Sequence, residues 1–129
     1  MILDSTFLVD FERERKKRKP GAASAFLRAH ADDQFCITFT VAGELAAGQS
    51  LGLERSKWYR FIQPFRILES SADVAWEFGR AFRYLQSQGT LIGANDLWIG
   101  ATGLAHGLPV VTRNAREFER IPGLVVLSY

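Results

Sequence analysis

Short apolar segments alternate along this chain with longer amphipathic ones, and this alternation constrains the fold more than any other feature of the sequence. The short segments are apolar on both faces, which is typical of strands in a parallel sheet that helices cover on both sides. We expect strands at residues 1–3, 35–39, 65–68, 109–112 and 124–127. The pattern therefore predicts a three-layer α/β/α sandwich around a parallel sheet of about five strands.

The amphipathic segments between these strands predict helices. The longest helix should begin at Ser71, whose hydroxyl suits an N-cap, and end at Gly89. Another helix should be capped by Thr40 after the second strand, and a third should begin at Asn95 or Asp96. Four residues at helical spacing mark the expected buried stripe of the longest helix: Val74, Phe78, Phe82 and Leu85.

Length and composition indicate a single domain that spans residues 1–129. Hydrophobic residues make up 47% of the chain and charged residues 23%, which is a globular composition. No apolar run approaches the roughly 18 to 20 residues of a membrane span, and the acidic N-terminal stretch is unlike a secretion signal. The single cysteine, Cys36, excludes an internal disulfide and a cysteine-based metal cluster. We therefore expect a cytoplasmic protein with no membrane association.

A basic run, RERKKRK at residues 13–19, contains six of the 16 Lys and Arg residues in a chain whose net charge is +2. A local patch of this kind attracts phosphate groups even when the whole protein is nearly neutral. The ordinary alternative is a solvated helix end that leads into a loop at Pro20. The sequence leaves both interpretations open.

Polar residues follow several of the predicted strands, at the edge of a parallel sheet where ligands bind. Asp4 follows the first strand, Glu44 lies one turn into the helix after the second, and Asn114 follows the strand PVVT. Asp96 begins the helix that leads into that strand, so it lies at the same edge. Four separate segments are thus expected to bring these side chains together.

Three carboxylates at one site repel one another, and a divalent cation supplies the missing counter-charge. Oxygen donors without Cys or His favour Mg²⁺ or Mn²⁺ over zinc, and such an ion suits phosphodiester hydrolysis. Each residue also has an ordinary interpretation: Asp4 and Asp96 as helix N-caps, and Asn114 as a turn residue. Glu44 has apolar neighbours on its helix, so an ordinary role explains it less well.

Three stretches of the chain resemble a known family. They are ILDSTFLVDF at residues 2–11, TFTVAGELAAG at 38–48, and GANDLWIGATGLAHGLPVVTRNAREFERIPGL at 93–124. These residues resemble the PIN-domain ribonucleases and, among them, the VapC-type toxins of bacterial toxin–antitoxin pairs. The resemblance extends over the whole chain. It implies a Mg²⁺- or Mn²⁺-dependent endoribonuclease in which Asp4, Glu44 and Asp96 bind the metal.

The same resemblance implies roles for four further residues. Asn114 occupies a fourth family position that is often Asp, and because Asn carries no charge, a second metal ion is in doubt. Glu117 is a partial replacement or simply an exposed helical acid. Thr6 holds the Asp4 carboxylate in place, caps the first helix, or does both. Arg113 contacts a phosphate or is an ordinary surface residue.

For function, the resemblance implies a toxin that inhibits growth by cleaving structured RNA, such as tRNA or rRNA, unless a cognate VapB-type antitoxin neutralises it. Arg13, Lys16 and Lys17, together with Arg113, would follow the RNA backbone. Homodimers are common in the family, and Trp76 is our candidate for a contact with a second subunit or the antitoxin. The chain has no helix-turn-helix signature, so we expect no DNA binding without the antitoxin.

Other functions compete with this interpretation. A haloacid-dehalogenase phosphatase requires a second Asp where this chain has Thr6, and a receiver domain requires an Asp after the third strand, where it has Glu69. The remaining alternative is a catalytically weak PIN-like module that binds protein or RNA, for which Asn114 is the only hint. Asp10 points away from Asp4 at helical spacing, so we expect no role for it at the site.

Overall fold

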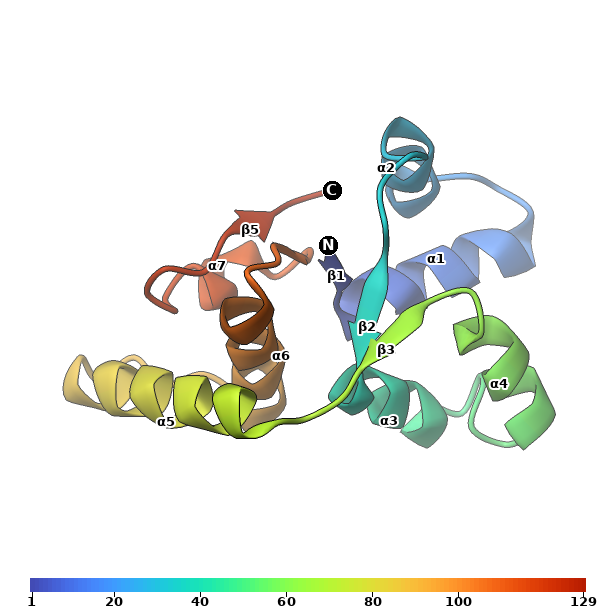
Figure 1. Cartoon of the computed structure of the whole chain (residues 1–129). Coiled ribbons are helices and arrows are strands. Elements are labelled where there is room, and N and C mark those ends of the chain that lie inside the picture. Colours follow the sequence, from blue (N-terminus) through green and yellow to red (C-terminus); the bar gives the residue numbers. More distant parts are fainter.

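The computed structural model describes residues 1–129 and contains a five-stranded parallel sheet (Figure 1). The strands lie in the order β3-β2-β1-β4-β5, so β1 is central and pairs with β2 and β4. Ile2 of β1 lies opposite Cys36 on one side and Val110 on the other. The strands are β1 (Ile2–Leu3), β2 (Cys36–Thr38), β3 (Arg66–Leu68), β4 (Val110–Val111) and β5 (Val126–Leu127).

Seven helices connect and flank these strands, which confirms the predicted α/β architecture. In Figure 1, α5 and α6 lie together on one side of the molecule, while α1 and α4 lie on the other. No helix is both long enough and apolar enough to span a membrane. The helices are α1 (Ser5–Lys17), α2 (Ala22–Ala29), α3 (Phe39–Ala47), α4 (Arg55–Ile62), α5 (Ala72–Ser87), α6 (Ala94–His106) and α7 (Ala115–Phe118).

The central strands have almost no contact with solvent, as their apolar composition predicts. Ile2, Leu3, Ile37, Val110 and Val111 are all completely buried. Strands this short form only a few ladder hydrogen bonds, so the burial of their side chains contributes most of the free energy that holds them in place. The rigid centre of the sheet therefore fixes the positions of the residues that follow β1 and β4.

The second strand ends earlier than the sequence predicts, and the next helix begins earlier. Thr38, rather than Thr40, caps α3: its hydroxyl accepts a hydrogen bond from the Val41 N–H at 3.1 Å. Phe39 is the first residue of α3, and its side chain is 49% exposed. The apolar run suggested a longer strand, but a buried threonine at the strand end satisfies a free helix N–H, and this capping decides the boundary.

The longest predicted helix is confirmed as α5, with Ser71 as its N-cap. Its predicted apolar stripe is wrong at Phe82, which is 37% exposed, whereas Ala81 is buried. The physical reason is that α5 packs mainly on α6, where Phe78 stacks on Trp98 with ring centroids 3.9 Å apart. This single partner covers a narrower face of α5 than helical periodicity implies.

Candidate active site

Asp4 lies where the central strand β1 ends, and it caps α1. It is only 2% exposed, and three neighbours bind its carboxylate. The Phe7 N–H donates to Oδ1 at 2.8 Å, and the Thr112 hydroxyl donates to Oδ2 at 2.6 Å. The Thr6 hydroxyl lies 2.9 Å from both oxygens. The carboxylate is therefore held in one orientation by groups from α1 and from the end of β4.

Burial raises the pKa of Asp4 above its usual value, and the negative charge of Glu44 acts in the same direction. The hydrogen bonds from Thr112, Phe7 and Thr6 oppose this shift because they stabilise the charged form. Asp4 is therefore a buried acid whose environment also holds another carboxylate. Its capping role and its place at the site are compatible, because the three donors fill three of the roughly four acceptor positions of the carboxylate and leave one free.

Glu44 lies on α3 and connects that helix to two others. The Ser5 hydroxyl of α1 donates to its Oε2, and the Asn95 amide of α6 donates to its Oε1 at 2.9 Å. Glu44 is half-buried, so its carboxylate still faces solvent on one side. The site thus joins α1, α3 and α6, which are far apart in the sequence.

Asp96 lies in the first turn of α6 and has the most informative electrostatic environment. Burial, followed by the negative charges of Glu44, Asp4 and Glu117, raises the pKa of Asp96 to about 6. Four carboxylates are therefore near enough to act on one another. The rim cation Arg113 forms its ion pair with Asp10 rather than with any of these four carboxylates.

The chemistry and the charge of the candidate ligands suit a hard divalent cation. All of them are carboxylate oxygens, and burial together with their mutual repulsion raises the pKa of Asp96. The side chains do not yet form a complete set of metal ligands, because no three Asp, Glu, His or Cys side chains lie close enough together to hold a metal ion. The hydrogen bonds of Glu44 to Ser5 and Asn95 occupy its oxygens instead.

Asn114 and Glu117 lie at the β4–α7 junction beside this cluster. Asn114 is the N-cap residue of α7 and is half-buried, but its side chain forms no capping hydrogen bond. Its backbone N–H donates to the Thr112 hydroxyl at 2.9 Å. Glu117 is half-buried, and its charge contributes to the raised pKa of Asp96. Glu117 is therefore not simply an exposed helical acid.

The basic residues predicted to meet RNA form no ion pairs with the carboxylates of the site. Arg113 pairs with Asp10 at 2.6 Å, and Arg13 pairs with the same residue at 3.1 Å. Asp10 also accepts a hydrogen bond from the Tyr129 hydroxyl at 3.0 Å, so it organises the rim although it lies off the site. Lys16 and Lys17 lie further along α1 and are exposed.

Sequence reasoning missed three residues that hold the carboxylates: Ser5, Asn95 and Thr112. Ser5 and Asn95 are sequence neighbours of Asp4 and Asp96, and that adjacency was the only available signal. Each of the two binds Glu44 rather than the acid beside it. Thr112 lies 108 positions from the Asp4 that it binds, and no local pattern reports that contact.

Replacing Thr112 with Val should raise the pKa of Asp4 further, because the variant loses a hydrogen bond to the charged form. We expect unfolding free energy to fall by about 1 to 2 kcal/mol, measured by urea denaturation at pH 7.5. The matched control is Thr102→Val, since Thr102 is also buried but donates to a helical carbonyl, that of Trp98. Equal losses in the two variants would contradict a special role for the Thr112 hydroxyl.

Replacing Asp96 with Asn should stabilise the protein at neutral pH in the presence of EDTA. Because the folded-state pKa of about 6 exceeds the ordinary value of 3.8, the folded state binds more protons than the unfolded state between these values. Wild-type stability should therefore decline as pH rises from about 4 to above 6, and the variant should lack this decline. At pH 7.5 we expect the unfolding free energy of the variant to exceed that of wild type by about 1 kcal/mol, a figure discounted for the partial exposure of Asp96.

Urea denaturation between pH 4.5 and 8 measures this difference. The control variant is Asp32→Asn, which removes an exposed aspartate in a turn away from the site. A stability difference between wild type and Asp96→Asn that does not change with pH would contradict the proposed carboxylate repulsion.

Comparison with known proteins identifies the family of this chain. Residues 1–124 match the model of the PIN domain family. A ribonuclease VapC2 from Rickettsia felis is 31% identical over 102 residues, which cover 76% of each chain. A tRNA(fMet)-specific endonuclease VapC from Salmonella typhimurium is 36% identical over 95 residues, covering 70% of this chain and 72% of the relative.

A solved structure of DNA-bound VapBC from Salmonella typhimurium has the same fold. It superimposes with a TM-score of 0.84 at 28% identity, covering 98% of this chain and 96% of the other. The family match ends at Leu124, just before β5, and the structural match covers nearly the whole chain. The chain therefore belongs to the PIN-domain family and, within it, to the VapC ribonucleases.

Proposed function

We propose that this chain is the toxin of a type II toxin–antitoxin pair and acts as a Mg²⁺-dependent endoribonuclease, for which Mn²⁺ can substitute. The observation that carries the proposal is the group of four carboxylates around Asp96: burial, followed by the negative charges of the other three, raises the pKa of that residue to about 6. Repelling oxygen donors at the edge of a parallel sheet are what a hard divalent ion requires. The alternative is a catalytically weak PIN-like module that binds RNA or protein.

Asp4, Glu44 and Asp96 would hold the ion. When bound, such an ion lowers the pKa of a coordinated water and stabilises charge on a phosphoryl oxygen. Thr6 and Thr112 keep the buried Asp4 carboxylate in one orientation. These contacts resemble the supporting hydrogen bonds that orient ligands at other metal sites.

Other residues would prepare the site for RNA. Ser5 and Asn95 position Glu44 until the ion binds. Asn114 has a free side-chain amide at the rim, and its oxygen can accept a hydrogen bond from water. Arg113 is held by Asp10 with 60% of its side chain exposed, so its guanidinium can meet a phosphate without leaving the rim.

The proposed substrate is a structured RNA of the tRNA or rRNA class. Sequence-specific proteins recognise RNA mainly at loops, where unpaired bases are accessible. The Salmonella relative is named for action on tRNA(fMet), which supports tRNA as the first substrate to test. Reaction in the cytoplasm would give the protein access to both RNA classes.

The proposed partner is a VapB-type antitoxin that neutralises the chain and supplies the DNA-binding part. Similar solved structures are VapBC complexes, including DNA-bound ones from Rickettsia felis and Salmonella typhimurium. We also propose a homodimer. Trp76 is 66% exposed on α5 and remains the candidate contact with a second subunit or the antitoxin.

The proposal is tested by incubating the purified chain with tRNA and with rRNA stem-loops, in Mg²⁺, in Mn²⁺ and in EDTA. We expect defined fragments with either metal and none in EDTA. Cleavage that persists in EDTA would contradict the metal mechanism. Metal binding shown by calorimetry without cleavage of any RNA would favour the binding module.

A second experiment tests the toxin assignment. The chain is expressed in a bacterial host that lacks the neighbouring antitoxin gene, and growth and RNA integrity are followed together. We expect growth arrest with RNA fragments, and recovery when the antitoxin is co-expressed. Normal growth with intact RNA would contradict the assignment.

A further inference from the structure

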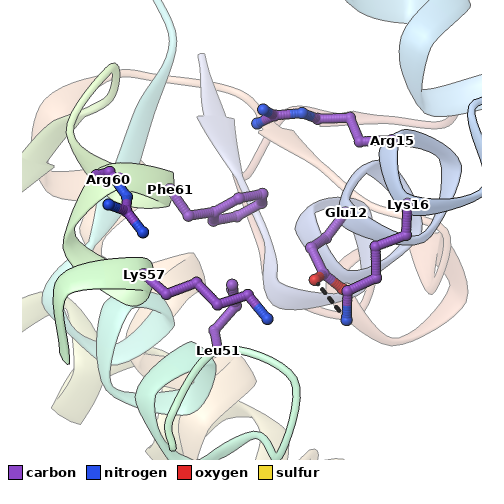
Figure 2. Close-up of a pocket in the computed structure, with 7 residues that line it drawn as sticks. All are labelled: Glu12, Arg15, Lys16, Leu51, Lys57, Arg60 and Phe61. Carbon is purple, nitrogen blue, oxygen red and sulfur yellow. Dashed lines mark ion pairs between the residues drawn. The ribbon is translucent and has the colours of Figure 1, made fainter. Parts of the chain in front are cut away.

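A basic pocket lies between the C-terminal half of α1 and helix α4, away from the carboxylates (Figure 2). Its volume is about 390 Å³. Four cations and one carboxylate surround it, which leaves an excess of three positive charges. The lining residues are Glu12, Arg15, Lys16, Leu51, Lys57, Arg60 and Phe61.

Two lysines from different helices converge on one residue of this pocket. Lys57 of α4 donates to the Ser50 carbonyl at 2.7 Å, and Lys16 of α1 donates to the Ser50 hydroxyl. Figure 2 shows both lysine side chains ending in the same part of the pocket, beside Leu51 and Glu12. Like charges brought together in this way repel each other, so the arrangement favours an anion between them.

The one carboxylate of the pocket is already engaged. Glu12 pairs with Lys16 at 2.9 Å and accepts a hydrogen bond from the Ser50 hydroxyl at 2.7 Å. Although burial raises the pKa of Glu12, its hydrogen bonds with Ser50 and Lys16 outweigh burial and hold that pKa below its usual value. Glu12 is therefore charged at neutral pH and balances only one of the four cations.

The other cations have no carboxylate partner. Arg15 lies over the Phe11 ring, with 5.8 Å between its guanidinium carbon and the ring centroid, and it forms no ion pair. Arg60 is exposed and also forms no ion pair. A guanidinium with free N–H groups binds phosphate oxygens in pairs, whereas a lysine binds them as a point charge. The pocket offers both kinds of donor.

We propose that this pocket binds a backbone phosphate of the RNA substrate and anchors the RNA at a distance from the carboxylates. The inference rests on the proposed ribonuclease function. Helix α1 connects the two places, because Asp4 caps its beginning and Lys16 lies near its end. With a rise of about 1.5 Å per residue, twelve residues span about 18 Å. At duplex spacing, that distance corresponds to about five phosphates of one strand.

The charge distribution favours RNA over an acidic protein segment. The positive surface does not end at the pocket but continues through the rest of the basic run at residues 13–19. A single extended polyanion can therefore reach the carboxylate site, the pocket and the end of α1 along one helix. A short acidic peptide would need only the pocket.

The experiment compares wild type with Lys57→Gln/Arg60→Gln, and uses Arg80→Gln/Arg83→Gln as the matched control. The control removes two exposed arginines from α5, on the other side of the molecule. Binding of a fluorescein-labelled tRNA anticodon stem-loop is measured by anisotropy in EDTA, where no cleavage should occur, at several KCl concentrations. Cleavage of the same RNA is measured in Mg²⁺.

For the pocket variant we expect the Kd for RNA to rise about tenfold, and the salt dependence of log Kd to fall by about one per removed cation. In cleavage, KM should rise while kcat stays near the wild-type value, because the carboxylates are intact. Cleavage of an RNA tetranucleotide, too short to reach the pocket, should be unchanged. The α5 control should match wild type in every assay.

The outcomes separate this inference from the proposed function. If wild type cleaves RNA and the pocket variant has the same Kd and salt dependence, the inference is wrong and the ribonuclease function stands. If wild type neither binds nor cleaves RNA, both are wrong. If the pocket variant binds RNA normally but no longer binds the purified antitoxin, the pocket is a protein-binding site and the inference is overturned.

Folding is checked by thermal denaturation of each variant. Should the double variant unfold, Arg15→Gln is the second test, because that side chain forms no hydrogen bond or ion pair within the protein. Like the double variant, Arg15→Gln should raise the Kd for RNA and lower the salt dependence of log Kd. Both changes should be smaller than in the double variant. An unchanged Kd in Arg15→Gln would then contradict the inference.

Discussion

The variants Asp4→Asn and Asp96→Asn should each lose RNA cleavage in Mg²⁺ by at least about 1000-fold, measured by single-turnover fragment analysis. Each substitution removes one negative charge from the group that we propose binds the ion, and it replaces a carboxylate oxygen with an amide nitrogen that cannot bind a cation. The two acids come from different elements, the end of β1 and the start of α6. A similar loss in both variants is expected because they would bind one ion.

The control for this comparison is again Asp32→Asn, which changes the same residue type in an exposed turn. It should cleave RNA at the wild-type rate. Unfolding cannot explain the loss in Asp96→Asn, since that variant should be more stable than wild type in EDTA at pH 7.5. Retention of even a tenth of the wild-type rate in Asp4→Asn or Asp96→Asn would rule out these acids as metal ligands.

The variant Phe7→Ala should lose about 3 to 5 kcal/mol of unfolding free energy, measured by urea denaturation. Phe7 is completely buried in the first turns of α1. Its ring packs edge-on against Phe26, at 5.7 Å between centroids, and against Tyr129, at 4.6 Å. Removing it leaves a cavity beside Phe26 and Tyr129 that cannot close fully, because the surrounding interior is close-packed.

The matched control is Phe39→Ala, which shortens a phenylalanine that is 49% exposed at the start of α3. We expect Phe39→Ala to lose less than about 1 kcal/mol of unfolding free energy. The Phe7 N–H that binds Asp4 belongs to the backbone and survives the substitution. Any variant molecules that remain folded should therefore keep the orientation of Asp4. A loss in Phe7→Ala no larger than in Phe39→Ala would contradict the assignment of Phe7 to the core.

Much of the architecture was predictable because it depends on local patterns. Apolar runs such as PVVT and LVVL predicted β4 and β5, and Ser71 predicted the start of α5. Asp4 and Asp96 were also predictable as neighbours at one edge, because every strand of a parallel sheet ends on the same side. The boundary at Phe39 and the exposure of Phe82 were predicted wrongly, because a cap and a single packing partner decided them.

The polar contacts around the site were not predictable to the same extent. Asp10 illustrates the reason: its partners Arg113 and Tyr129 lie more than 100 positions along the chain. The meeting of Lys16 and Lys57 at Ser50 likewise depends on how α4 lies against α1. Such pairs leave no period or spacing in the sequence.

Local patterns in this chain are enough to give the succession of strands and helices along it and the acids that follow the strands. Hydrophobic periodicity and capping act within a few residues, so they can be recognised along the chain. The folded arrangement was needed to show which hydroxyl and amide hold each carboxylate, which cation is neutralised, and where unbalanced charge remains. Those outcomes depend on the directions of side chains from distant segments, and packing sets these directions after the elements have formed.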